Sequence, residues 1–160
     1  MQKLNIAILS YRSAPFGGGQ GIYIHDISKA LSLMGHQVDV ISGPPYPNLS
    51  EKINLIKLPG LNLFQTFSFK ERLKIFIKKK NKRAIDFYEF FSTFFGGFPE
   101  MRTFGERAKE FLDENHHYDI VIDNQSVSYG MLKIQKKFPL LEIIHHPITK
   151  DYKFELQLNS

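Results

Sequence analysis

The fold is decided by residues 4–43, which read LNIAILSYRSAPFGGGQGIYIHDISKALSLMGHQVDVISG. Residues 4–10 form a short apolar run with two β-branched isoleucines, a pattern typical of a buried strand. After a glycine-containing loop, apolar side chains recur at the spacing of one helix face. Gly35 stands where that helix should end, and residues 37–42 are again apolar and β-branched. The pattern therefore predicts a strand, a glycine loop, a helix and a second, parallel strand.

The glycine loop contains Gly17, Gly18, Gly19 and Gly21, with Gln20 between the last two. Because glycine has no Cβ, its backbone N–H groups can approach a ligand closely, and a helix N-terminus adds positive partial charge. A phosphate or a carboxylate is therefore the predicted ligand, and the alternative is a flexible surface loop. Neither the dinucleotide fingerprint G-x-G-x-x-G nor the phosphate loop G-x-x-x-x-G-K-[ST] is present.

The rest of the chain alternates between predicted strands and predicted helices. The strands are expected at residues 53–58, 118–122 and 140–145, and the helices at residues 103–115 and 126–138. Thr103 and Glu106 have the spacing of a capping box at the start of the first of these helices. The alternation implies an α/β fold, a Rossmann-like doubly wound parallel sheet with helices on both faces. The 160 residues are enough for one such domain.

Polar side chains follow the last two predicted strands. Asp123, Asn124 and Gln125 come after one strand, and His145 and His146 end the other. Ligands of open parallel sheets bind at the carboxyl ends of the strands, so these residues are candidates for a binding site. The Asp123 carboxylate could orient an acceptor hydroxyl or cap the next helix, and both roles stay open. The histidine pair has no third ligand nearby in the sequence, so we expect no metal site.

The net charge of +5 is concentrated in residues 70–83, KERLKIFIKKKNKR, where eight basic residues and one acidic residue give a local charge of +7. Leu73, Phe76 and Ile77 share one face of the predicted helix. A basic amphipathic helix suits an anionic membrane surface, and the alternative is a solvated helix whose apolar stripe packs on the domain. Nucleic acid is not expected as a partner, because no recognised nucleic-acid module surrounds this one segment.

Several classes of protein are excluded by absent features. The chain has no cysteine, which rules out disulfides and cysteine-ligated metals. Hydrolase motifs such as G-x-S-x-G and H-E-x-x-H are missing. The N-terminal apolar run is too short for a signal peptide, and no stretch approaches the ~20 apolar residues of a spanning helix. We therefore expect a cytoplasmic protein, with peripheral contact at the inner membrane face if the basic helix binds lipid.

Taken in order, these motifs resemble the N-terminal domain of a family 4 glycosyltransferase, a retaining enzyme with the GT-B fold. The resemblance rests on the glycine loop and on three later groups of residues. These are Leu31, Gly35, His36, Val38 and Val40; YDIVIDNQ at residues 118–125; and IIHHPI at residues 143–148. The segment FGGFPE at residues 95–100 resembles a feature of one branch of the family.

The resemblance implies one half of a GT-B enzyme that transfers a sugar, with retention, from a nucleotide-sugar donor to a sugar or lipid-linked acceptor. The donor is a substrate, so no separate cofactor is implied. Catalytic roles would fall to His145, which would contact the donor sugar, and to Asp123. The glycine loop with Gln20 would bind the donor diphosphate, and Asn124, Gln125 and His146 would line the cleft.

The same resemblance bears on domain organisation. Residues 1–160 would be the acceptor-side domain, and the C-terminal domain that grips the donor nucleotide would lie outside this chain. We therefore expect no transferase activity from the chain alone. Two other classes remain open: a stand-alone Rossmann-like module that binds a nucleotide or an anion, and a protein that binds a membrane surface without catalysis.

Overall fold

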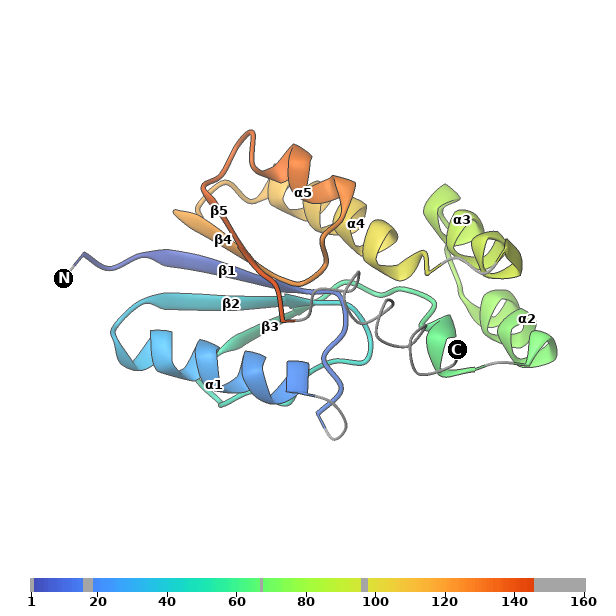
Figure 1. Ribbon diagram of the computed structural model, residues 1–160, viewed down its shortest axis with the longest axis horizontal. Helices are drawn as coiled ribbons and strands as arrows, with labels where there is room; N and C mark the ends of the chain where they lie inside the picture. The colour runs from blue at the N-terminus through green and yellow to red at the C-terminus, as the bar shows by residue number, and fades with distance from the viewer. Residues whose placement is uncertain (1, 16–18, 67, 96–97, 146–160) are drawn as a thin grey trace, which may run out of the picture.

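A computed structural model describes residues 2–15, 19–66, 68–95 and 98–145 of the chain. These residues form five strands, five α-helices and two short 3-10 helices, drawn in Figure 1. In chain order the elements are β1 (Asn5–Ser10), α1 (Gly19–Leu33), β2 (Gln37–Ser42), β3 (Asn54–Lys57), η1 (Leu63–Gln65), α2 (Phe69–Lys78), α3 (Ala84–Ser92), η2 (Thr93–Phe95), α4 (Glu100–Glu114), β4 (Ile120–Asn124), α5 (Tyr129–Ile134) and β5 (Leu140–Ile143).

The five strands form one parallel sheet in the order β3-β2-β1-β4-β5. From β1 the chain moves outward through β2 and β3, and it then returns to the other side of β1 to add β4 and β5. The strand order therefore reverses between β1 and β4. Such a reversal places a crevice at the carboxyl ends of the two strands, and ligands of open α/β sheets bind there.

Helices cover both faces of the sheet, as the doubly wound prediction requires. Along β1, Ile6 and Ile8 point to the face that α1 covers, and Ala7 and Leu9 point to the other face, where α4 and α5 pack. This alternation is the period of two that a strand imposes on its side chains. Each face thus has its own apolar core, and the fold class predicted from the sequence is confirmed (Figure 1).

The local signals in the sequence place most elements within a few residues. Gly35 adopts φ +94°, so the prediction that only glycine suits the end of α1 is confirmed. The predicted capping box is wrong. Helix α4 begins at Glu100, so Thr103 lies inside its first turn, where the hydroxyl donates to Glu89. Helix α5 is shorter than predicted: positive φ angles at Gln125 and Val127 delay its start to Tyr129, and it ends at Ile134.

A buried cluster of charges ties α3 to α4. Asp86 and Glu89 of α3 are at most 1% exposed, and Arg107 of α4 is 6% exposed. The Arg107 guanidinium donates to Asp86 Oδ1 at 2.8 Å and to Glu89 Oε2 at 2.6 Å. Lys79 also pairs with Asp86, at 2.6 Å. Burial alone would raise the pKa of Asp86, but hydrogen bonds from Lys79, the Arg83 backbone and Arg107 outweigh it and lower that pKa.

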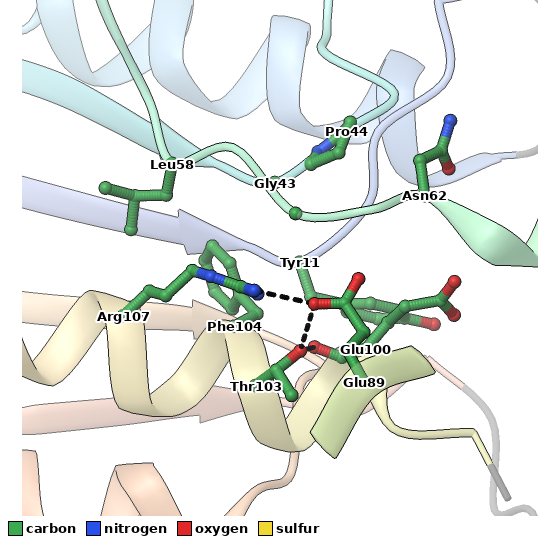
Figure 2. A pocket seen from close by; sticks show the side chains of 11 residues that line it. Tyr11, Gly43, Pro44, Leu58, Asn62, Glu89, Glu100, Thr103, Phe104 and Arg107 are labelled. Atoms are coloured by element: carbon green, nitrogen blue, oxygen red, sulfur yellow. Dashed lines mark hydrogen bonds and ion pairs between the residues drawn. The ribbon is translucent and has the colours of Figure 1, made fainter. Parts of the chain in front are cut away.

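The same cluster reaches the loop after β3. The second carboxylate oxygen of Glu89 accepts the backbone N–H of Leu61 at 2.7 Å. Figure 2 shows Glu89, Thr103 and Arg107 around a cavity of about 10 Å³, which is at most the space of one water molecule. This site is too small for a substrate. Its role is to fix the segment that contains α2 and α3 onto the sheet.

Replacing Arg107 with alanine should destabilise the protein strongly. The substitution leaves the Asp86 and Glu89 carboxylates in a buried site without their shared cation, and breaking a buried ion pair costs about 3–5 kcal/mol. The free energy of unfolding, measured by urea titration, reports this loss. Arg102→Ala, at an exposed position of the same helix, is the control and should cost about 1 kcal/mol or less. Equal losses in the two variants would show that the buried cluster is not a stabilising link.

Candidate functional site

The candidate site lies where β1 and β4 end side by side. Leu9 of β1 pairs in register with Asp123 of β4, so Ser10 and Asn124 stand next to each other at the carboxyl edge. Beyond β1 the chain is held by a short hydrogen bond between the Ser10 and Ser13 hydroxyls, and Ser13 N–H donates to the Pro45 carbonyl at 2.9 Å. The loop that leads into α1 therefore starts from a fixed position.

His145 is anchored to the end of β4. Its Nε2 lies 2.6 Å from Asn124 Oδ1, and its backbone N–H donates to Gln125 Oε1 at 3.2 Å. An amide oxygen can only accept, so Nε2 donates in this arrangement. The imidazole also meets the Tyr23 ring of α1 edge to face, with 4.7 Å between the centroids. The structure thus brings together three predicted site residues, His145, Asn124 and Gln125, beside the helix that follows the glycine loop.

Asp123 is fully buried, and its carboxylate is occupied by the loop that follows β4. One oxygen accepts the backbone N–H groups of Ser126, at 2.8 Å, and Val127, at 3.3 Å, and the other accepts the Ser126 hydroxyl. These bonds brace the loop and do not cap a helix, because α5 begins only at Tyr129 with Ser128 at its N-cap. The helix start predicted near Ser126 is absent, and the role of orienting an acceptor hydroxyl stays a prediction. Asp123 acts on the site by holding the segment that carries Asn124 and Gln125.

Glu142 is a neighbour of Asp123 that the sequence analysis missed. The two residues are in register on β4 and β5. Burial, a hydrogen bond with Asp123 and the charge of Asp123 raise the pKa of Glu142 to about 8. Near neutral pH Glu142 therefore keeps its proton, which avoids the repulsion between adjacent carboxylates. The sequence feature that could have pointed to Glu142 is a single acidic residue inside an otherwise apolar strand.

Tyr11 is a further residue at this edge of the sheet, within residues 10–21 that strand order places along the site, although no specific role was predicted for it. It follows β1 directly, and its phenol lies near Gln20 in the first turn of α1. Burial raises the pKa of the Tyr11 phenol, while the nearby Arg12 charge and the Gln20 side chain partly offset that effect. Tyr11 therefore stays protonated near neutral pH. Its position directly after a strand at the switch point is the signal that places it along the site.

The glycines of the loop have different surroundings. Gly19 is exposed, and a Cβ built on it would meet no atom within 4 Å. Gly21 is buried, and a Cβ built on it would overlap the carbonyl of Ala14, whose carbon would be 2.9 Å away. Gly21 thus allows Ala14 to lie against α1, whereas the position of Gly19 has room for a side chain among the described residues. Gly17 and Gly18, like His146, lie outside the described residues.

Comparison with known proteins identifies the family. The model for "Glycosyltransferase Family 4" matches residues 17–159. This chain belongs to glycosyltransferase family 4. It is also 40% identical, over 156 residues, to the MMP alpha-(1->4)-mannosyltransferase of Mycolicibacterium hassiacum. That match covers 96% of this chain, and the chain spans 37% of the length of the relative.

Family membership confirms the resemblance seen in the sequence, and the parallel sheet agrees with the Rossmann-like half of a GT-B fold. Within the described part of this family 4 chain, no three His, Asp or Glu side chains gather closely enough to hold a metal ion. Among the helices of the same residues, none has both the length and the apolar character needed to cross a bilayer.

The glycine loop of this family 4 chain provides a matched pair of substitutions. Gly21→Ala should destabilise the protein by about 1–3 kcal/mol, because the methyl group would overlap the Ala14 carbonyl and displace the loop. Gly19→Ala adds the same methyl group in open space, so it should be neutral or stabilise by up to about 1 kcal/mol. Urea titration of both variants measures the difference. A Gly21→Ala variant as stable as Gly19→Ala would contradict the packing described for this loop.

Proposed function

We propose that this chain is the acceptor-side domain of an enzyme that transfers a sugar, with retention, from a nucleotide-sugar donor to a hydroxyl acceptor. The observation that carries the proposal is the position of His145. Asn124 and Gln125 hold it at the switch point of the sheet, beside the first helix after the glycine loop. Membership of family 4 supports the reaction class.

The chemistry follows from the elements at this edge. When the donor bond breaks, negative charge develops on the departing diphosphate, and the sugar takes on oxocarbenium character. The N-terminus of α1, where Gly19 leaves open space, offers backbone N–H groups and a favourable dipole to that diphosphate. His145 would face the donor sugar, and the amide groups of Asn124 and Gln125 keep it in place. Catalysis would then come mainly from charge stabilisation and from orientation of the acceptor.

The donor nucleotide would be bound mainly by a second domain outside residues 1–160. The relative from M. hassiacum, of which the chain spans 37%, is long enough to contain one. In this proposal the 160 residues alone do not catalyse transfer. The name of that relative makes a mannosyl group the first donor sugar to test. The acceptor, a sugar or a lipid-linked sugar, and the cytoplasmic location stay predictions.

The role of His145 can be tested in the complete protein that contains this chain. His145→Ala should lower kcat by about 100- to 1,000-fold, the usual loss when one preorganised contact to the reacting groups is removed. The assay follows sugar transfer or donor hydrolysis with GDP-mannose and, in parallel, UDP-glucose. Circular dichroism verifies that the variant is folded.

The matched control is His117→Ala, because His117 is exposed and precedes β4 at the opposite end of the strand. This control should keep the activity of the parent protein. A His145→Ala variant that is folded and retains full turnover would refute the proposed role. If the parent protein turns over no nucleotide sugar under any condition, the transferase proposal itself fails.

A further inference from the structure

Helices α2 and α3 form a unit beyond the carboxyl edge of the sheet, at the end of the molecule toward which the strands point (Figure 1). This α2–α3 unit comprises residues 69–95 and includes η2. Helix α2 has no fully buried residue, but Leu73, Ile75 and Phe76 pack against the small core of Leu61, Leu63 and Phe90. The Phe76 ring stacks on Phe90 at 4.5 Å and meets Phe87 edge to face at 5.1 Å. Most of the remaining surface of α2 is therefore free to contact something else.

Aromatic side chains are exposed along this unit. We define the aromatic patch as Phe69, Phe87, Phe91 and Phe94, whose side chains are 44–54% exposed. Three of them form a continuous row, since the Phe94 ring lies 5.6 Å from that of Phe69 and 6.3 Å from that of Phe91. A soluble surface seldom exposes adjacent large rings of this kind unless they bind a partner.

Basic side chains are exposed on the same α2–α3 unit. Lys70, Lys74 and Lys78 are exposed and follow one another at intervals of four residues, so they form one stripe along α2. Ile77, which is 63% exposed, lies beside this stripe. Other cations of the basic segment serve the fold instead, because Lys79 pairs with Asp86 and Arg83 with Glu110.

We propose that the α2–α3 unit is a docking surface for an anionic lipid bilayer. The exposed rings would insert at the interface of the bilayer, and the lysines would bind the anionic lipid headgroups. The α2–α3 unit thus offers both an apolar and a basic contact. A duplex nucleic acid or another soluble polyanion without exposed bases would use the lysines but would leave the aromatic patch in water. Charge and apolar exposure together therefore favour lipid.

The position of the unit gives the docking a consequence for the candidate site. The α2–α3 unit and the carboxyl ends of the strands lie at the same end of the molecule (Figure 1). A bilayer bound to the unit would thus lie on the side of the chain where His145 is held. If the proposed transferase function is correct, this arrangement suits an acceptor that is anchored in the membrane.

The test is vesicle sedimentation with the complete protein, without any substrate. Vesicles of phosphatidylcholine with one third phosphatidylglycerol should bind the protein, vesicles of phosphatidylcholine alone should not, and added salt should weaken the binding. The triple variant Lys70→Gln/Lys74→Gln/Lys78→Gln should lower the partition coefficient on the order of 100-fold, which is about fivefold for each lysine. Because no substrate is present, failure here is distinct from failure of the transferase assay.

Two matched controls distinguish binding through the docking surface from non-specific binding caused by net charge or by exposed apolar side chains. Lys29→Gln/Lys52→Gln/Lys136→Gln removes the same charge at exposed positions elsewhere and should leave binding nearly unchanged. Phe91→Gln should weaken binding, whereas Leu132→Gln, at a similarly exposed position of α5, should not. The proposal is overturned if the complete protein does not bind anionic vesicles, if the two triple variants lose binding equally, or if Phe91→Gln binds like the parent protein.

Discussion

Strand β1 is paired on both sides, with β2 and with β4, and its residues from Ile6 to Ser10 are buried. This double pairing is the constraint on which the site depends. The chain must leave the sheet at Ser10, turn into α1 over a loop that Gly21 allows to pack closely, and later return to add β4 on the other side. The carboxyl ends of β1 and β4 then meet where the strand order reverses. The candidate site residues described above lie at that junction or beside it.

Much of this arrangement could be predicted from the sequence, because its signals are local. The period of the apolar residues located the strands. The end of α1, which stops at Leu33, was recognisable from Gly35, because glycine is the residue type that best tolerates φ +94°. The capping box failed for a non-local reason. Thr103 has the right neighbours in sequence, but its hydroxyl donates to Glu89 in a preceding helix, 14 residues away. The bracing of the loop after β4 by Asp123 could be assigned only once the buried N–H groups around its carboxylate were known. Glu142 was missed and Tyr11 was given no specific role, because burial gives both residues their properties.

The basic segment shows the same limit in its electrostatics. Its charge of +7 was evident from the sequence, but which cations pair with acids and which face solvent was not. Lys79 and Arg83 pair with acids of α3 and α4, which lie up to 27 residues further along the chain. Lys70, Lys74 and Lys78 face solvent beside exposed phenylalanines. One segment thus contributes cations both to the fold and to an outer surface, and only the tertiary structure separates the two groups.

The central claim is that the junction of β1, β4 and α1 is where a nucleotide sugar places its diphosphate and its sugar. A crystal structure of the complete protein with a non-transferable nucleotide-sugar analogue tests it most directly. The account predicts the diphosphate at the N-terminus of α1, near Gly19, and the sugar ring in contact with His145. An analogue bound with its diphosphate and sugar away from this edge of the sheet, while Asn124 and Gln125 still hold His145, would contradict it.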